Sequence, residues 1–239
     1  MSQPPAPAAS GRAAAPLPWL LLLLSVTTGL VDAISVLGLG KVFTANMTGN
    51  IVFLGFAASG APGFKVAPYV VAITAFLAGA AVAGRTGKAH ADRSLARWLL
   101  TSATIEAILL WVAAIFAVGL DIAAGTPEAN VYAIIALTAI AMGYRNATIR
   151  QLKIPDLTTT VLTLTLTGLA ADSTVAGGSN PNWARRIGSV VAIFGGAALG
   201  ALLVTRTGLV IPLVLAGGLV LAGTLACALH PGARNPAHV

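Results

Sequence analysis

The sequence has few charged residues and a single cysteine. Only 9% of its 239 residues are Asp, Glu, Lys or Arg, against roughly 25% in soluble proteins, which is too few for the surface of a water-soluble domain. Cys227 has no second cysteine to pair with, so a disulfide-bonded module is excluded. Zinc-binding, phosphate-binding and serine-hydrolase motifs are also missing from the sequence. We therefore expect no enzyme, and neither a metal nor a cofactor.

Apolar residues make up 57% of the chain, and the mean hydropathy is +0.88, as expected for an all-α polytopic membrane protein. Two short apolar segments, residues 43–59 and 157–171, are interrupted by polar groups and would reach only about 26 and 22 Å as helices. We expect them to be re-entrant or broken. Six longer segments can each cross about 30 Å of hydrocarbon, namely residues 17–39, 66–84, 98–120, 131–149, 187–205 and 208–229.

The distribution of the 14 basic residues predicts the topology. If the two short segments re-enter and the N-terminus is cytoplasmic, 11 Lys and Arg residues lie inside and 3 outside; if all eight segments cross, the best division is 9 to 5. Because cytoplasmic loops are enriched in Lys and Arg, we expect six spanning helices with both termini in the cytoplasm. The net charge of +7 is then explained by these loops, and no nucleic-acid partner is expected.

The chain is predicted to form one transmembrane domain, residues 17–229, between two tails. Residues 1–16 are rich in Pro and Ala and are predicted to be a disordered cytoplasmic tail, and residues 230–239 form a C-terminal tail. Around Asp32 the sequence also resembles a signal-peptide cleavage site, an alternative in which the first apolar segment would be removed.

The sequence repeats itself at an offset of about 114 residues. Gly29–Ala33 matches Gly143–Ala147, which defines repeat 1 at about residues 17–120 and repeat 2 at about 131–229. Three spanning segments per repeat is an odd number, so the two repeats are expected to be inverted relative to each other, as in many secondary transporters. Counting the short segment, the third segment of each repeat has small residues at every fourth position, which we interpret as packing faces. They are Ala75, Gly79 and Ala83 in the first repeat and Gly188, Ala192, Gly196 and Gly200 in the second.

Asp32 is the most unusual residue, because it lies inside the first apolar segment, where a charge costs roughly 2.5 to 3.5 kcal/mol to insert. Its counterpart in the second repeat is Asn146, next to Arg145. Three alternatives follow for Asp32: it bonds the neighbouring re-entrant backbone, it pairs with Arg145, or it serves as a proton or cation site. Arg145 lies at the predicted cytoplasmic end of its segment, where snorkelling is the default explanation.

The first short segment contains the polar cluster Asn46, Thr48, Gly49 and Asn50. We predict that Thr48 or Asn50 caps a half-helix, whose N-terminus would favour an anion or carboxylate.

In the second short segment Thr163 and Thr165 alternate with Leu. This pattern fits either an extended strand with one Thr face or a helix in which Thr hydroxyls bond carbonyls one turn back. Glu106 interrupts another apolar run and could pair with a basic group or line a cavity; we assign it no role in the site.

Residues Gly29–Ser35 and the motif Thr48-Gly49-Asn50 resemble the YoaK-like family of bacterial integral membrane proteins, a domain-of-unknown-function family. The resemblance extends over about residues 17–229. It implies a six-spanning fold in the bacterial cytoplasmic membrane and no particular substrate.

We expect a secondary transporter or facilitator that moves a small solute or ion across the lipid bilayer. The alternative is a non-transporting membrane scaffold or partner-binding subunit, and the oligomeric state is left open. The candidate pathway residues are Asp32, Asn46, Thr48, Gly49, Asn50, Arg145, Asn146, Thr163 and Thr165.

Overall fold

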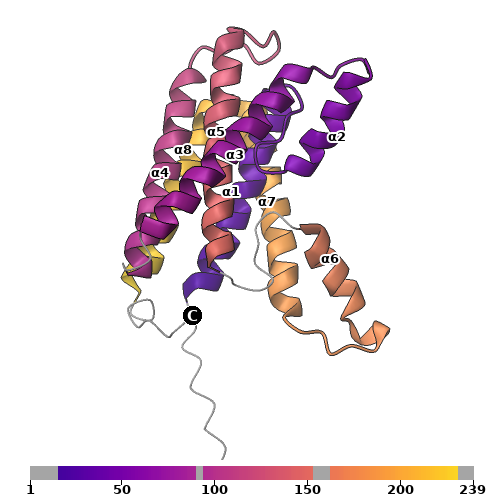
Figure 1. The fold of residues 1–239 in the computed structure, drawn as a ribbon, viewed down its shortest axis with the longest axis vertical. Helices are drawn as coiled ribbons and strands as arrows, with labels where there is room; N and C mark the ends of the chain where they lie inside the picture. The colour runs from indigo at the N-terminus through magenta and orange to yellow at the C-terminus, as the bar shows by residue number, and fades with distance from the viewer. Residues whose placement is uncertain (1–15, 90–93, 153–161, 231–239) are drawn as a thin grey trace, which may run out of the picture.

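The computed structural model describes residues 16–89, 94–152 and 162–230, in which helices are joined by loops (Figure 1). The predicted tails, residues 1–16 and 230–239, lie outside the described residues apart from Pro16 and His230. The helices are α1 (Pro16–Gly38), α2 (Met47–Ala58), α3 (Val66–Ala89), α4 (Leu95–Phe116), α5 (Glu128–Gln151), α6 (Leu162–Ala171), the short 3₁₀ helix η1 (Thr174–Ala176), α7 (Trp183–Thr207) and α8 (Val210–Leu229).

Five helices in the described part of the chain are long and apolar enough to cross a membrane: α1, α3, α4, α7 and α8. They coincide with five of the six predicted spanning segments. The sixth segment forms α5, which is 24 residues long but more polar. The short helices α2 and α6 have 12 and 10 residues, about 18 and 15 Å, so neither reaches across the hydrocarbon layer.

The long helices pack in pairs drawn from opposite halves of the chain. α1 packs on α7, α3 on α5 and α4 on α8, with further contacts between α4 and α5 and between α1 and α8. The two short helices lie outside this bundle, α2 against α3 and α6 against α7. In Figure 1 α2 lies toward the upper end of the bundle and α6 toward the lower end.

Glycines bring α1 and α7 into backbone contact. A Cβ atom on Gly29 of α1 would overlap the carbonyl oxygen of Ile193, and a Cβ on Gly196 of α7 would overlap the carbonyl oxygen of Val26. Only glycine allows two helices to approach this closely. The predicted packing role of the small residues in this helix is therefore confirmed at Gly196.

The crossing of α3 and α5 is built in the same way. A Cβ on Gly79 of α3 would overlap the carbonyl oxygen of Ile140, and a Cβ on Gly143 of α5 would overlap that of Phe76. The two crossings share one reciprocal pattern. The carbonyl group that faces a glycine always belongs to the residue three positions before the glycine of the partner helix.

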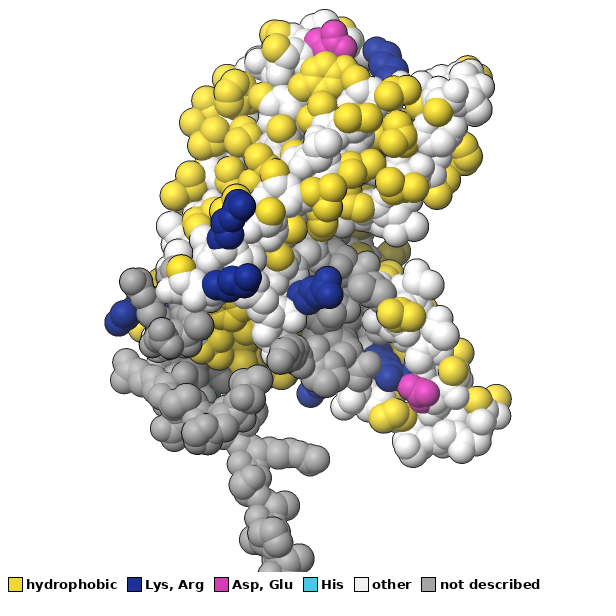
Figure 2. All heavy atoms as spheres, in the orientation of Figure 1, with side chains coloured by type: hydrophobic (Ala, Val, Ile, Leu, Met, Phe, Trp, Pro, Cys, Tyr) yellow, Lys and Arg dark blue, Asp and Glu magenta, His cyan; other side chains and the backbone are white. Residues whose placement is uncertain are grey.

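The outer surface of the bundle is apolar. Figure 2 shows hydrophobic side chains spread over the visible face of the helices, with the visible basic groups gathered mainly toward the lower end. Such a surface would be unstable in water and is the surface that lipid covers. Large exposed side chains include Leu77, Ile115, Phe194, Leu202 and Ile211.

We predict that Gly196→Ala destabilises the protein by about 1 to 3 kcal/mol, because the added methyl group forces α1 and α7 apart. The neighbouring Gly195 has nothing within 4 Å of an added Cβ. Gly195→Ala is therefore the matched control and should stabilise the helix by up to about 1 kcal/mol. Both are measured as free energies of unfolding in mixed micelles, and equal effects of the two variants would contradict close packing at this crossing.

Candidate functional site

Asp32 holds the chain segment that connects α1 to α2. Its Oδ1 atom accepts hydrogen bonds from the backbone N–H groups of Ala45 at 2.9 Å and Thr44 at 3.3 Å. Of the three alternatives raised for Asp32, the bond to the neighbouring backbone is confirmed. A carboxylate in this position compensates amide groups that precede α2 and have no helical partner.

Asn50 holds the same connection from the α2 side. The side chain is fully buried; its Oδ1 accepts from the Phe43 N–H at 2.9 Å and its Nδ2 donates to the Phe43 carbonyl at 2.6 Å. Gly49 makes room for the Phe43 ring, since a Cβ there would lie 2.7 Å from the ring.

The predicted capping by Thr48 or Asn50 is wrong. α2 begins at Met47, so both residues lie within its first turn, and Asn46 takes the N-cap position without a side-chain hydrogen bond to the helix. Thr48 is exposed. Asn50 is engaged with Phe43 instead, because its buried amide can bond both polar groups of one peptide unit.

Residues 157–161 of the second short segment lie outside the described residues. Its remainder, residues 162–171, is helical, so the extended alternative for the Thr–Leu alternation is wrong there. Thr167 Oγ1 donates to the Thr163 carbonyl at 2.9 Å, the local bond expected of a helix. Thr165 is buried and Thr163 exposed. Because α6 packs on α7 toward the opposite end from α2, the structure does not gather these threonines around Asp32. Asn146, on α5, donates to the Met142 carbonyl at 2.8 Å.

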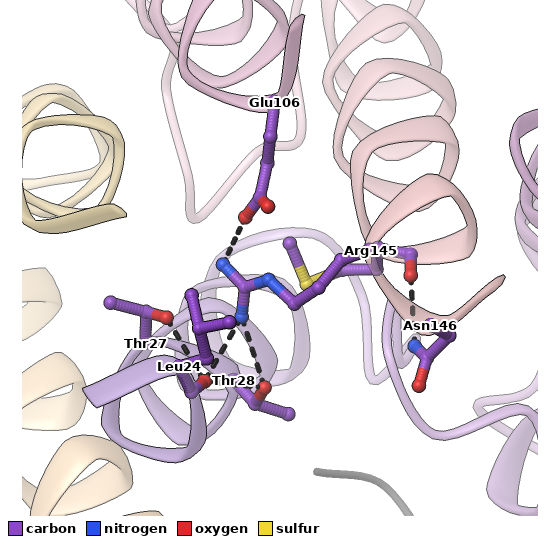
Figure 3. A network of polar contacts seen from close by, with 7 residues as sticks. Leu24, Thr27, Thr28, Glu106, Arg145 and Asn146 are labelled. Atoms are coloured by element: carbon purple, nitrogen blue, oxygen red, sulfur yellow. Dashed lines mark hydrogen bonds and ion pairs between the residues drawn. The ribbon is translucent and has the colours of Figure 1, made fainter. Parts of the chain in front are cut away.

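Arg145 is the centre of a buried polar network (Figure 3). Its guanidinium forms an ion pair with Glu106 of α4, and both residues are at most 3% exposed. On the other side, Nη1 donates to the carbonyl of Leu24 and to the hydroxyl of Thr28, both at 3.0 Å. One side chain on α5 thus contacts both α1 and α4.

Two predictions for Arg145 are therefore wrong. It does not pair with Asp32, whose carboxylate is turned toward Thr44 and Ala45. It does not snorkel either, because its side chain is 2% exposed. Glu106 was expected to pair with a basic group or to line a cavity, but it was given no role in the site; the pairing is confirmed, with Arg145 as the partner. An acidic residue in the middle of an apolar helix was the signal, but the sequence alone did not identify its partner.

A bundle of lipid-facing apolar helices that encloses an ion pair defines the class as a multi-pass membrane protein. The chain belongs to the family described as "Protein of unknown function (DUF1275)", whose model matches residues 20–226. Together with the relative described next, this match confirms the predicted resemblance to the YoaK-like family.

A curated relative is the UPF0700 transmembrane protein YoaK of Bacillus subtilis (strain 168). It is 39% identical over 155 residues, which cover 64% of this chain and 65% of the relative. The match thus spans slightly less than two thirds of the relative's length. No solved structure matches the chain.

We predict that Glu106→Leu and Arg145→Met each destabilise the protein by about 3 to 5 kcal/mol, since each leaves a buried charge without its partner. The double variant should lose less than the sum of the two, by at least about 1 kcal/mol. Arg150→Met, at an exposed position of the same helix, is the control and should change stability by less than about 0.5 kcal/mol. The free energies of unfolding are measured by titrating the protein with SDS in mixed micelles. Strictly additive losses of stability would exclude coupling between Glu106 and Arg145.

Proposed function

We propose that this protein is a secondary transporter or facilitator of a small solute in the bacterial cytoplasmic membrane. The observation that carries the proposal is the ion pair of Glu106 and Arg145, buried among apolar helices. Charged groups at membrane depth are costly and typically mark solute or ion pathways.

In this proposal α5 is the sixth spanning helix. Its 24 residues reach about 36 Å, and it packs between α3 and α4, which are both candidate spans. Glu128 and Arg150 lie in the end turns of α5, and the one charged residue between residues 129 and 149 is Arg145, which is compensated inside the bundle by Glu106. The hydropathy of α5 therefore understates how well it fits the bilayer.

The helix crossings support an inverted repeat. The glycines of the two first helices, Gly29 and Gly143, are about 114 residues apart, and those of the two third helices, Gly79 and Gly196, are about 117 apart. The first helix of each half crosses the third helix of the other half. The short helices α2 and α6 occupy equivalent places at opposite ends of the bundle (Figure 1). Secondary transporters with broken helices share this plan.

The basic residues support an orientation with both termini in the cytoplasm. Arg85 and Lys88 end α3, Arg97 begins α4, Arg150 ends α5 and Arg185 begins α7. In Figure 1 these four helix ends lie toward the lower end, where α1 begins, and Figure 2 shows most of the visible basic side chains there. The lower end is then the cytoplasmic side.

The alternative, a non-transporting scaffold, also has an observation in its favour. The Oδ1 atom of Asp32 accepts hydrogen bonds from the backbone N–H groups of Thr44 and Ala45, and a carboxylate with a purely structural role would do the same. Topology and flux measurements separate the two functions.

For topology, we predict that Thr48→Cys reacts with a membrane-impermeant thiol reagent from the outer face only, and Thr163→Cys from the cytoplasmic face only. Both positions are exposed at opposite ends of the bundle. The background is Cys227→Ser, which removes the single native thiol, and Ser94→Cys at the start of α4 reports the cytoplasmic face. Labelling of both positions from one face would refute the inverted topology, and labelling from neither face would favour the scaffold.

For flux, proteoliposomes are tested with formamide, urea, glycerol, sodium formate and potassium chloride. We expect at least one solute to enter faster than in protein-free liposomes. Asp32→Asn should reduce that flux severalfold while the protein stays folded, because the neutral amide holds the Thr44 and Ala45 amides less strongly. If every solute enters at the protein-free rate, the transporter proposal is wrong.

A further inference from the structure

A small cavity lies beside the Glu106–Arg145 pair, between α1, α4, α5 and α8. About 30 Å³ of it is open to the centres of water-sized molecules. Since one water needs roughly 10 to 15 Å³ by this measure, the cavity has room for about two waters or one solute of a few non-hydrogen atoms. Its polar lining consists of Ser102, Glu106, Arg145, Thr148 and Thr224.

Three polar atoms of these lining residues have no hydrogen-bond partner in the described part of the chain: Ser102 Oγ, Thr148 Oγ1 and Arg145 Nε. Their residues are 7%, 5% and 2% exposed, respectively. Buried polar groups in native proteins are almost always bonded, and leaving one without a partner costs free energy. All three atoms belong to residues that line one cavity, and a hydrogen-bonding molecule bound there would supply their missing partners.

The charge of the cavity restricts what the guest can be. Glu106 and Arg145 compensate each other, so the lining is electrically neutral as a whole. An ion entering alone would add an uncompensated charge at membrane depth. A neutral molecule that donates and accepts hydrogen bonds adds none, and it can bond the hydroxyls and the Nε–H group.

The cavity lies in the half of the bundle that the proposed topology places toward the cytoplasm. Its apolar lining includes Leu20 near the start of α1, Leu99 near the start of α4 and Leu152 directly after α5. These are the helix ends on the same side as the basic residues. A guest would therefore reach the ion pair from the cytoplasmic side.

We propose that this cavity binds a small uncharged solute that forms hydrogen bonds, of the size class of formamide or a pair of waters. Ser102, Thr148 and the Arg145 Nε–H group are its binding groups. Binding is a property of the cavity alone, whereas passage of the same solute across the membrane rests on the proposed transport function.

Binding is tested by the charge selectivity of thiol labelling in detergent, where no transport occurs. In the Cys227→Ser background, Ser102→Cys is reacted with neutral methyl methanethiosulfonate and with anionic and cationic methanethiosulfonates. Ser94→Cys, exposed at the start of α4, gives the intrinsic rate of each reagent. After this normalisation the neutral reagent should react at Ser102→Cys roughly 100-fold faster than either charged one, the factor that corresponds to the cost of a charge inside a membrane protein. Formamide should slow the neutral reaction.

Equal normalised rates for neutral and charged reagents would overturn the proposal, as would no reaction at all with folded protein. If Ser102→Cys does not fold, as judged by gel filtration, Thr148→Cys gives the same readout from α5.

Passage is tested by formamide entry into proteoliposomes. Thr148→Val keeps the shape of the side chain and removes the hydroxyl, so it should reduce formamide entry severalfold. Thr104→Val, on the exposed face of α4, should leave it unchanged. Entry of sodium formate that depends on Thr148 would overturn the neutral-solute proposal and leave the transporter proposal intact.

Discussion

The compensation of Arg145 is the constraint on which the arrangement of the bundle depends. A guanidinium inside a membrane protein needs acceptors for its charge and its N–H groups. The two Nη groups of Arg145 find them on two other helices: Glu106 on α4, and Leu24 and Thr28 on α1. Because the guanidinium is planar and its donors point in set directions, these contacts restrict the depth and rotation of α1, α4 and α5 relative to one another. The remaining long helices, α3, α7 and α8, then pack around this centre.

Two kinds of contact thus stabilise the bundle: the buried ion pair and the glycine crossings. The ion pair is strong and local, whereas the glycine crossings are weak per atom and extended, since they rely on close backbone approach. The helix that carries the ion pair's arginine also carries Gly143, two residues earlier. One short stretch of α5 therefore determines both its polar and its apolar neighbours.

Much of the fold could be predicted from the sequence, because membrane spans depend on the length and hydropathy of local segments. Residues 208–229 became α8, Val210–Leu229, with the start shifted to follow Gly208, which has a positive φ of 74°. The site was predicted less well. Asp32 and Glu106 both interrupt apolar runs, and nothing in one sequence says which of them faces Arg145. Asp32 and Asn50 fix the α1–α2 connection through bonds to backbone groups of Ala45 and Phe43, which every residue has and which therefore leave no pattern in the sequence.

The packing of α1 on α7, which lies far away in the sequence, has a consequence for biosynthesis. α1 emerges from the ribosome early, but the helix that its Gly29 contacts, α7, follows more than 150 residues later. At translation rates of about 5 to 20 residues per second, α1 waits roughly 10 to 30 seconds in the membrane with its glycine face uncovered. The amino-terminal half therefore cannot complete its packing before α7 and α8 have been inserted.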